Sequence, residues 1–240
     1  MTEDAPRILD LSTFNFDGFV QFFFAREVVP DEEQFDSLLR NALGQQFEEA
    51  ETSSPAIVVG HMTKLFSEFG AIAPRYSMGQ IDQGIWGILG ERLRLYELLW
   101  DESVPLLERA ACIRSMYSVY SDFVCGRHSG PLDSGFYMWW DLILHGFWCQ
   151  WGPEGRRTRW GDLSSLSADS TALLDVMFET LKRILELEDA RVQGCALHGL
   201  GHLHHPGVHE TVQKYIDNRE GKLTEQSLRW LEQCRDGTVM

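Results

Sequence analysis

The side chains of this chain that are best suited to chemistry lie close together near its C-terminus. The segment 189–216 carries five histidines, and His198 and His202 are four residues apart. Four residues turn an α-helix through about 400°, so both imidazoles can point to the same side. Cys195 precedes the pair and His205 follows it. Zinc sites take three or four such ligands, so His198, His202, Cys195 and His205 form a candidate metal site.

The same histidines are also explained without a metal. A histidine pair four residues apart is typical of a solvated helix face, and no H-E-x-x-H sequence contains it. Cys195 is expected to face the core, while His198 and His202 are expected on the open side. An exposed histidine pair is therefore the first interpretation, with zinc binding or a metal-dependent enzyme as the alternative. We predict no catalytic residues.

A second candidate is a cluster of arginines in an otherwise acidic chain. Arg156, Arg157, Arg159 and Trp160 fall in a polar loop rich in glycine, serine and arginine. Guanidinium groups beside an indole suit the binding of a carboxylate or phosphate, or stacking on a base. These four residues are the predicted partner-binding site. The alternative is that the arginines only pair with surplus carboxylates on the surface.

A third candidate lies in the aromatic segment 136–151. Asp141 and His145 are four residues apart there, as in half of an acid–base dyad. The sequence places no serine or cysteine nucleophile beside them, and packing in a core explains the aromatic side chains. Cys125 and His128 are close in sequence, but short spacing alone does not activate a thiol.

Composition and charge narrow the class of protein. The chain has 240 residues, of which 44% are hydrophobic, and a formal net charge of −15. Such a charge repels phosphate backbones, so we expect no nucleic-acid partner. The N-terminus shows no signal peptide, and no apolar run is long enough to span a bilayer, so no membrane partner is expected. Five cysteines without a C-x-x-C pair suit reduced thiols in the cytoplasm.

The elements that must position these side chains are predicted to be helices. Ser77 with Gln80 predicts a capping box, and Ser167 and Thr224 are predicted N-caps. Hydrophobic side chains recur at helical spacing after such caps and after prolines, and no alternation of strands and helices is visible. The first fifty residues are less regular, and 14–24 is either a buried helix or a short strand pair. Helices are predicted at 55–73, 77–99, 105–124, 135–148, 168–185, 190–203, 206–218 and 225–236, with a further one at 31–49.

The segment 189–216 resembles a HEAT repeat, especially the short bacterial kind. The resemblance rests on an apolar, alanine and leucine-glycine pattern in a first helix, a turn with proline, and a second amphipathic helix. Matching residues are Val192, Ala196, Leu197, Leu200, Gly201, Leu203, Pro206, Val208, Val212 and Ile216. Gln193 and His205 stand where the family often has arginine and aspartate. The resemblance implies a helical hairpin and a surface that binds other proteins.

The expected fold is therefore all-α, an irregular α-solenoid or array of antiparallel helix pairs that is HEAT-like at its C-terminal end. We expect one helical domain over 1–240, with a subdivision into 1–151 and 168–240 as the alternative. The expected function is a cytoplasmic protein–protein interaction or scaffold module without catalytic activity or a cofactor. Its partner is another protein of unknown identity.

Overall fold

Five of the described α-helices begin where a short polar side chain accepts a hydrogen bond from the first helical turn. Ser77 and Gln80 form the predicted capping box. Ser167 Oγ accepts from the Ser170 amide at 3.1 Å, and Thr224 Oγ1 accepts from the Ser227 amide at 3.1 Å. The predicted caps at these three positions are confirmed.

The computed structural model describes residues 7–30, 38–39, 47–90, 93–125, 134–149 and 161–239. Within this part the chain is mostly helical, which confirms the all-α prediction at that level. The helices are α1 (Phe16–Phe24), α3 (Pro55–Ser67), α4 (Phe69–Ile72), α5 (Met78–Leu89), α6 (Leu106–Ser118), α8 (Ser134–Trp148), α9 (Ala168–Leu185), α10 (Ala190–Leu203), α11 (Val208–Asp217) and α12 (Glu225–Asp236). A π-helical segment, Val119–Val124, extends α6. Short 3-10 segments are Leu11–Thr13, Ala73–Arg75, Leu95–Leu99 and Leu163–Ser165.

Two short strands were not predicted. β1 (Ile8–Asp10) pairs in parallel with β2 (Glu49–Glu51), with Leu9 opposite Ala50. Glu49 therefore lies in a strand, and the prediction of a helix reaching residue 49 is wrong at its end. Most of the rest of 31–49 lies outside the described residues. The segment 14–24 is resolved as a helix rather than a strand pair.

Two predicted helices are interrupted. The single helix predicted at 55–73 is wrong at Glu68, where α3 ends before α4 begins. The apolar stripe at 77–99 suggested a single helix, but α5 ends at Leu89 and Gly90 closes it. Arg94 then adopts a left-handed backbone conformation with φ of 49° before the 3-10 segment Leu95–Leu99. The stripe is continuous in sequence because both pieces bury their apolar side chains in the same core.

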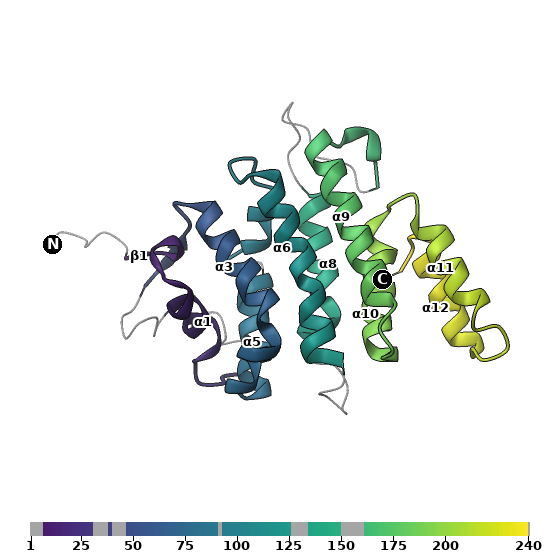
Figure 1. Ribbon diagram of the computed structural model, residues 1–240, viewed down its shortest axis with the longest axis horizontal. Coiled ribbons are helices and arrows are strands. Elements are labelled where there is room, and N and C mark those ends of the chain that lie inside the picture. Colours follow the sequence, from purple (N-terminus) through teal and green to yellow (C-terminus); the bar gives the residue numbers. More distant parts are fainter. Residues whose placement is uncertain are drawn as a thin grey trace.

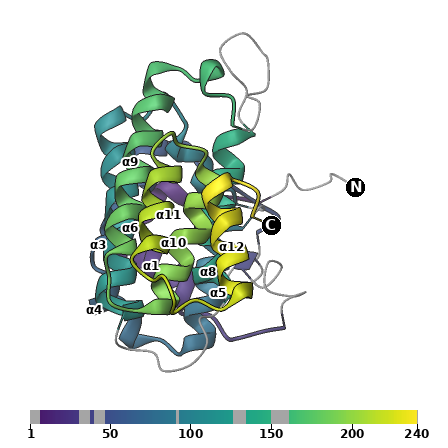
Figure 2. The same cartoon turned by 90° about the vertical axis from the view of Figure 1, so that its right-hand side faces the viewer.

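The helices form two rows, which Figures 1 and 2 show from the side and from one end. Helices α3, α6 and α9 pack side by side in one row. Helices α5, α8 and α10 pack side by side in the other, with α1 against α5 and α12 against α10. Helix α9 also packs on α10, and α11 packs on α12 at the C-terminal end. The buried apolar side chains of both rows form one hydrophobic core.

Helix α8 lies at the centre of this core, as its sequence without a polar face predicts. Trp139, Trp140 and Trp148 are fully buried. Trp139 packs edge-on against Phe66 of α3, with ring centroids 5.1 Å apart. Because α8 also packs against α5 and α10, it fixes the position of α10 and of the histidines on it. No helix in the described part of the chain is long and apolar enough to cross a membrane.

Candidate functional site

The predicted histidine cluster divides between two sides of α10. His198 and His202 face α8, where they meet Tyr137 and Asp141. His205 follows α10 and faces α9, where it meets Asp175. The residues predicted as one metal site are thus not gathered at one point.

His198 is buried, and the expectation of an exposed histidine pair is wrong for it. Its side chain is 2% exposed and stacks on the Tyr137 ring, with centroids 4.5 Å apart and planes at 16°. The sequence did not show this because α8 covers that face of α10. Burial lowers the pKa of His198, and the nearby His202 lowers it further.

His202 joins His198 to a carboxylate on α8. Its Nε2 lies 3.2 Å from Nε2 of His198 and 3.5 Å from Oδ1 of Asp141. The predicted pairing of Asp141 with His145 is not what the structure shows. His145 is exposed and lies 3.7 Å from the Cys149 thiol, whereas Asp141 meets the imidazole of another helix.

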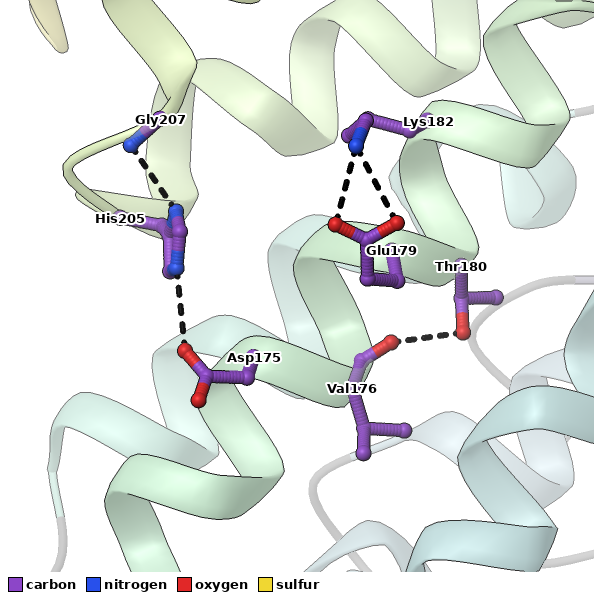
Figure 3. Close-up of polar contacts among 7 residues, drawn as sticks. All are labelled: Asp175, Val176, Glu179, Thr180, Lys182, His205 and Gly207. Carbon is purple, nitrogen blue, oxygen red and sulfur yellow. Dashed lines mark hydrogen bonds and ion pairs between the residues drawn. The ribbon is translucent and has the colours of Figure 1, made fainter.

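Cys195 and His205 occupy other surroundings. Cys195 is fully buried, and burial raises the pKa of its thiol to about 12. His205 Nδ1 accepts a hydrogen bond from the Gly207 amide at 3.0 Å, and Nε2 lies 3.1 Å from Asp175 Oδ1 (Figure 3). Both ring nitrogens of His205 are thus engaged. Across the described ranges, no group of three or more histidine, cysteine, aspartate or glutamate side chains is placed to hold a metal ion.

The other predicted sites include residues that the structure does not describe. Arg156, Arg157, Arg159 and Trp160 lie outside the described residues, so their prediction stays a prediction. His128 lies outside them too, which leaves its pairing with Cys125 equally open.

A groove that the sequence did not predict lies among α9, α10 and α11. Its volume is about 610 Å³. Its apolar lining comes from Phe178 and Leu185 of α9 and Tyr215 of α11. Phe178 is held from one side by His205, whose ring stacks on it with centroids 4.0 Å apart. The polar lining residues are Lys182, Glu186, Gln193, Glu210, Thr211, Lys214, Asn218 and Arg219.

Arg219, in the turn that follows α11, is fixed in this groove by uncharged groups. Its guanidinium lies 3.5 Å from the centroid of the Tyr215 ring. Nη2 donates to Gln193 Oε1 at 3.1 Å, and Nη1 donates to the Tyr215 carbonyl at 3.4 Å. Gln193 is itself held, because it accepts from the Tyr215 hydroxyl at 2.9 Å and donates to the Leu187 carbonyl at 2.8 Å. Among the described residues, no carboxylate forms an ion pair with Arg219.

The remaining charges of the groove differ in how they are paired. Lys182 Nζ lies 2.9 and 3.1 Å from the two carboxylate oxygens of Glu179, as Figure 3 shows. Lys214 is exposed on α11, and no ion pair to it is found in the part of the chain that the structure describes. The groove thus holds three cations and two carboxylates, Glu186 and Glu210, in a chain of net charge −15.

Sequence reasoning missed this groove for a physical reason. Tyr215 and Arg219 are four residues apart, which is a visible signal for stacking along a helix. Gln193 accepts hydrogen bonds from both of these side chains, but it is 22 residues from Tyr215 in the sequence. It contacts Tyr215 because α10 and α11 fold into a hairpin. Comparisons with protein-family models, curated proteins and solved structures found no match for this chain.

Proposed function

We propose that this protein is a non-catalytic binding module that holds a segment of another protein in the groove among α9, α10 and α11. The segment is an extended peptide that carries an acidic side chain next to an apolar one. The observation that carries this proposal is Arg219, a guanidinium fixed by Tyr215 and Gln193 without a carboxylate partner in the described structure.

Arg219 supports an acidic ligand because its position is prepared in advance. A planar guanidinium binds a carboxylate through two parallel hydrogen bonds, and little side-chain entropy is lost if the guanidinium is already held. The chain has 36 acidic residues and 21 basic ones, yet none of the acidic side chains that the structure describes pairs with Arg219. Lys214 adds a second positive charge on α11, close to where the ligand carboxylate would lie.

The apolar side chains support a peptide rather than a small anion. Phe178, Leu185 and Tyr215 form a surface on which an apolar side chain of the ligand can be buried. Helix α11 has 10 residues, which corresponds to a length of about 15 Å. An extended segment of about four or five residues spans that length.

The arrangement of helices supports the same interpretation. The two rows suit an irregular α-solenoid with a HEAT-like C-terminal end, and such folds mostly bind other proteins on grooves between helices. The net charge of −15 disfavours nucleic acid as the ligand. Free cysteines, three of them buried, suit a cytoplasmic location.

Selection from a random peptide library tests the proposal. We expect the wild-type protein to enrich peptides in which an aspartate or glutamate lies next to an aromatic or branched aliphatic residue. Arg219→Gln should not enrich them, because it removes the guanidinium. Arg229→Gln is the matched control, because Arg229 lies on α12 outside the groove and pairs with Glu225 on the surface.

Two outcomes of the selection contradict the proposal. One is enrichment of basic peptides, which would place the binding site on the acidic surface instead. The other is enrichment of the same acidic peptides by wild type and by Arg219→Gln. Circular dichroism of both variants shows whether a loss of binding reflects a loss of folding.

A further inference from the structure

A second site lies on the other side of α10, where it packs on α8. We propose that His198 and His202 chelate one divalent transition-metal ion, such as Cu²⁺, Ni²⁺ or Zn²⁺, with Asp141 as the neighbouring carboxylate. This site is separate from the groove, so it does not depend on the proposed function.

The spacing of the two imidazoles fits a metal ion. Their Nε2 atoms share a hydrogen bond at 3.2 Å, and the rings are nearly perpendicular at 88°. With metal–nitrogen bonds of about 2.05 Å, this separation gives an N–metal–N angle of about 100°. That angle lies between those of octahedral and tetrahedral coordination. Both nitrogens are thus spaced as ligands without any movement of α10.

Asp141 supplies the charge that such a site uses. Its Oδ1 lies 3.5 Å from Nε2 of His202, so its negative charge lies beside the proposed ion. Because no three side chains are placed as ligands in the described structure, the two imidazoles are the protein ligands proposed. Water fills the remaining positions, and Asp141 attracts the cation.

The burial of His198 holds one ligand in a fixed position. Its ring stacks on Tyr137 and is 2% exposed, so the packing of α8 on α10 sets its orientation. A metal ion replaces the proton shared by the two Nε2 atoms, and little side-chain entropy is lost because the ring is already held.

Imidazole ligands also determine which ions should bind. Nitrogen ligands of this kind favour Cu²⁺ over Ni²⁺ and Zn²⁺, whereas Mg²⁺ and Ca²⁺ prefer oxygen ligands. We expect the affinity order to follow this preference, with Mg²⁺ and Ca²⁺ giving no binding at the same concentrations.

Isothermal titration of chelator-treated protein without a histidine tag, using Zn²⁺, Ni²⁺ and Cu²⁺ in turn, tests the proposal. We expect one ion per chain, a loss of more than about tenfold in affinity for His202→Gln, and a smaller loss for Asp141→Asn. His209→Gln is the control, because His209 is exposed on α11, and its affinity should equal that of wild type.

His202 is chosen over His198 because it is only partly buried, so its loss is less harmful to folding. Circular dichroism of each variant verifies the fold. Thermal unfolding gives an independent measurement, because a metal that binds the folded state raises the midpoint of wild type but not of His202→Gln. Absence of binding by wild type, or equal binding by wild type and a folded His202→Gln, would overturn the proposal.

Discussion

At the scale of single residues, the chain shows how little a side chain's type says about its surroundings. The sequence identified His198 and His202 as a pair and Cys195 as a core residue, and the structure agrees with both. It did not show that His198 is buried or that Asp141 faces His202, because both facts depend on how α8 packs on α10. The same limit applies to Arg219, whose partner Gln193 comes from another helix.

Gln193 gives the sharpest prediction at this scale. Gln193→Glu keeps an oxygen that can accept from Tyr215 and Arg219 but adds a carboxylate that neutralises the guanidinium. We expect the affinity for an acidic peptide to fall by about tenfold, which corresponds to about 1.4 kcal/mol. Fluorescence anisotropy of a labelled peptide measures it.

Gln213→Glu is the matched control for that change. It adds the same charge on α11, where Gln213 contacts Arg235 and Asp217 rather than the groove. Equal losses of affinity in both variants would mean that only the overall charge matters and not the state of Arg219.

At the scale of elements, capping residues and hydrophobic spacing predicted which segments are helical. They predicted less well where each helix ends and which elements it packs against. Capping residues such as Ser77 and Ser167 act within one turn, so they are readable from the sequence. The pairing of β1 with β2 joins segments about forty residues apart, and Glu49–Glu51 is only three residues long with alanine as its one apolar side chain. Nothing local distinguishes such a strand.

The glycines of α5 give a prediction about helix packing. A Cβ atom added at Gly84 would lie 2.3 Å from Cδ1 of Phe24 and 3.1 Å from the Phe23 carbonyl oxygen. Gly84→Ala should therefore force α1 away from α5 and lower the free energy of unfolding by about 1–3 kcal/mol. Chemical denaturation measures this change.

Gly60→Ala is the control for helix propensity. Gly60 lies within α3, and a Cβ atom there would meet nothing within 4 Å. This variant should raise the free energy of unfolding by roughly 0.5–1 kcal/mol, because alanine favours the helix. A gain of stability in Gly84→Ala as well would contradict the close packing of α1 on α5.

At the scale of the whole molecule, the two rows of helices share one core, with α8 in contact with helices from both halves of the chain. Hydrophobic spacing and capping residues predicted a helical protein but not which helices are neighbours. We expect the described rows to unfold together, because separating α10 from α8 exposes buried tryptophans.

Two spectroscopic probes check this expectation. Tryptophan fluorescence includes the buried rings Trp139, Trp140 and Trp148 of α8, whereas far-ultraviolet circular dichroism reports on all helices. The two denaturation curves should coincide. A separate transition by circular dichroism would show that the C-terminal helices unfold independently, as the alternative division into 1–151 and 168–240 implies.

The central claim is that the groove among α9, α10 and α11 binds an acidic peptide through Arg219. The most direct measurement is the dissociation constant of one selected peptide for wild type, Arg219→Gln and Arg229→Gln. We predict a constant at least about tenfold larger for Arg219→Gln and an unchanged one for Arg229→Gln. Equal constants for all three folded proteins would contradict the claim.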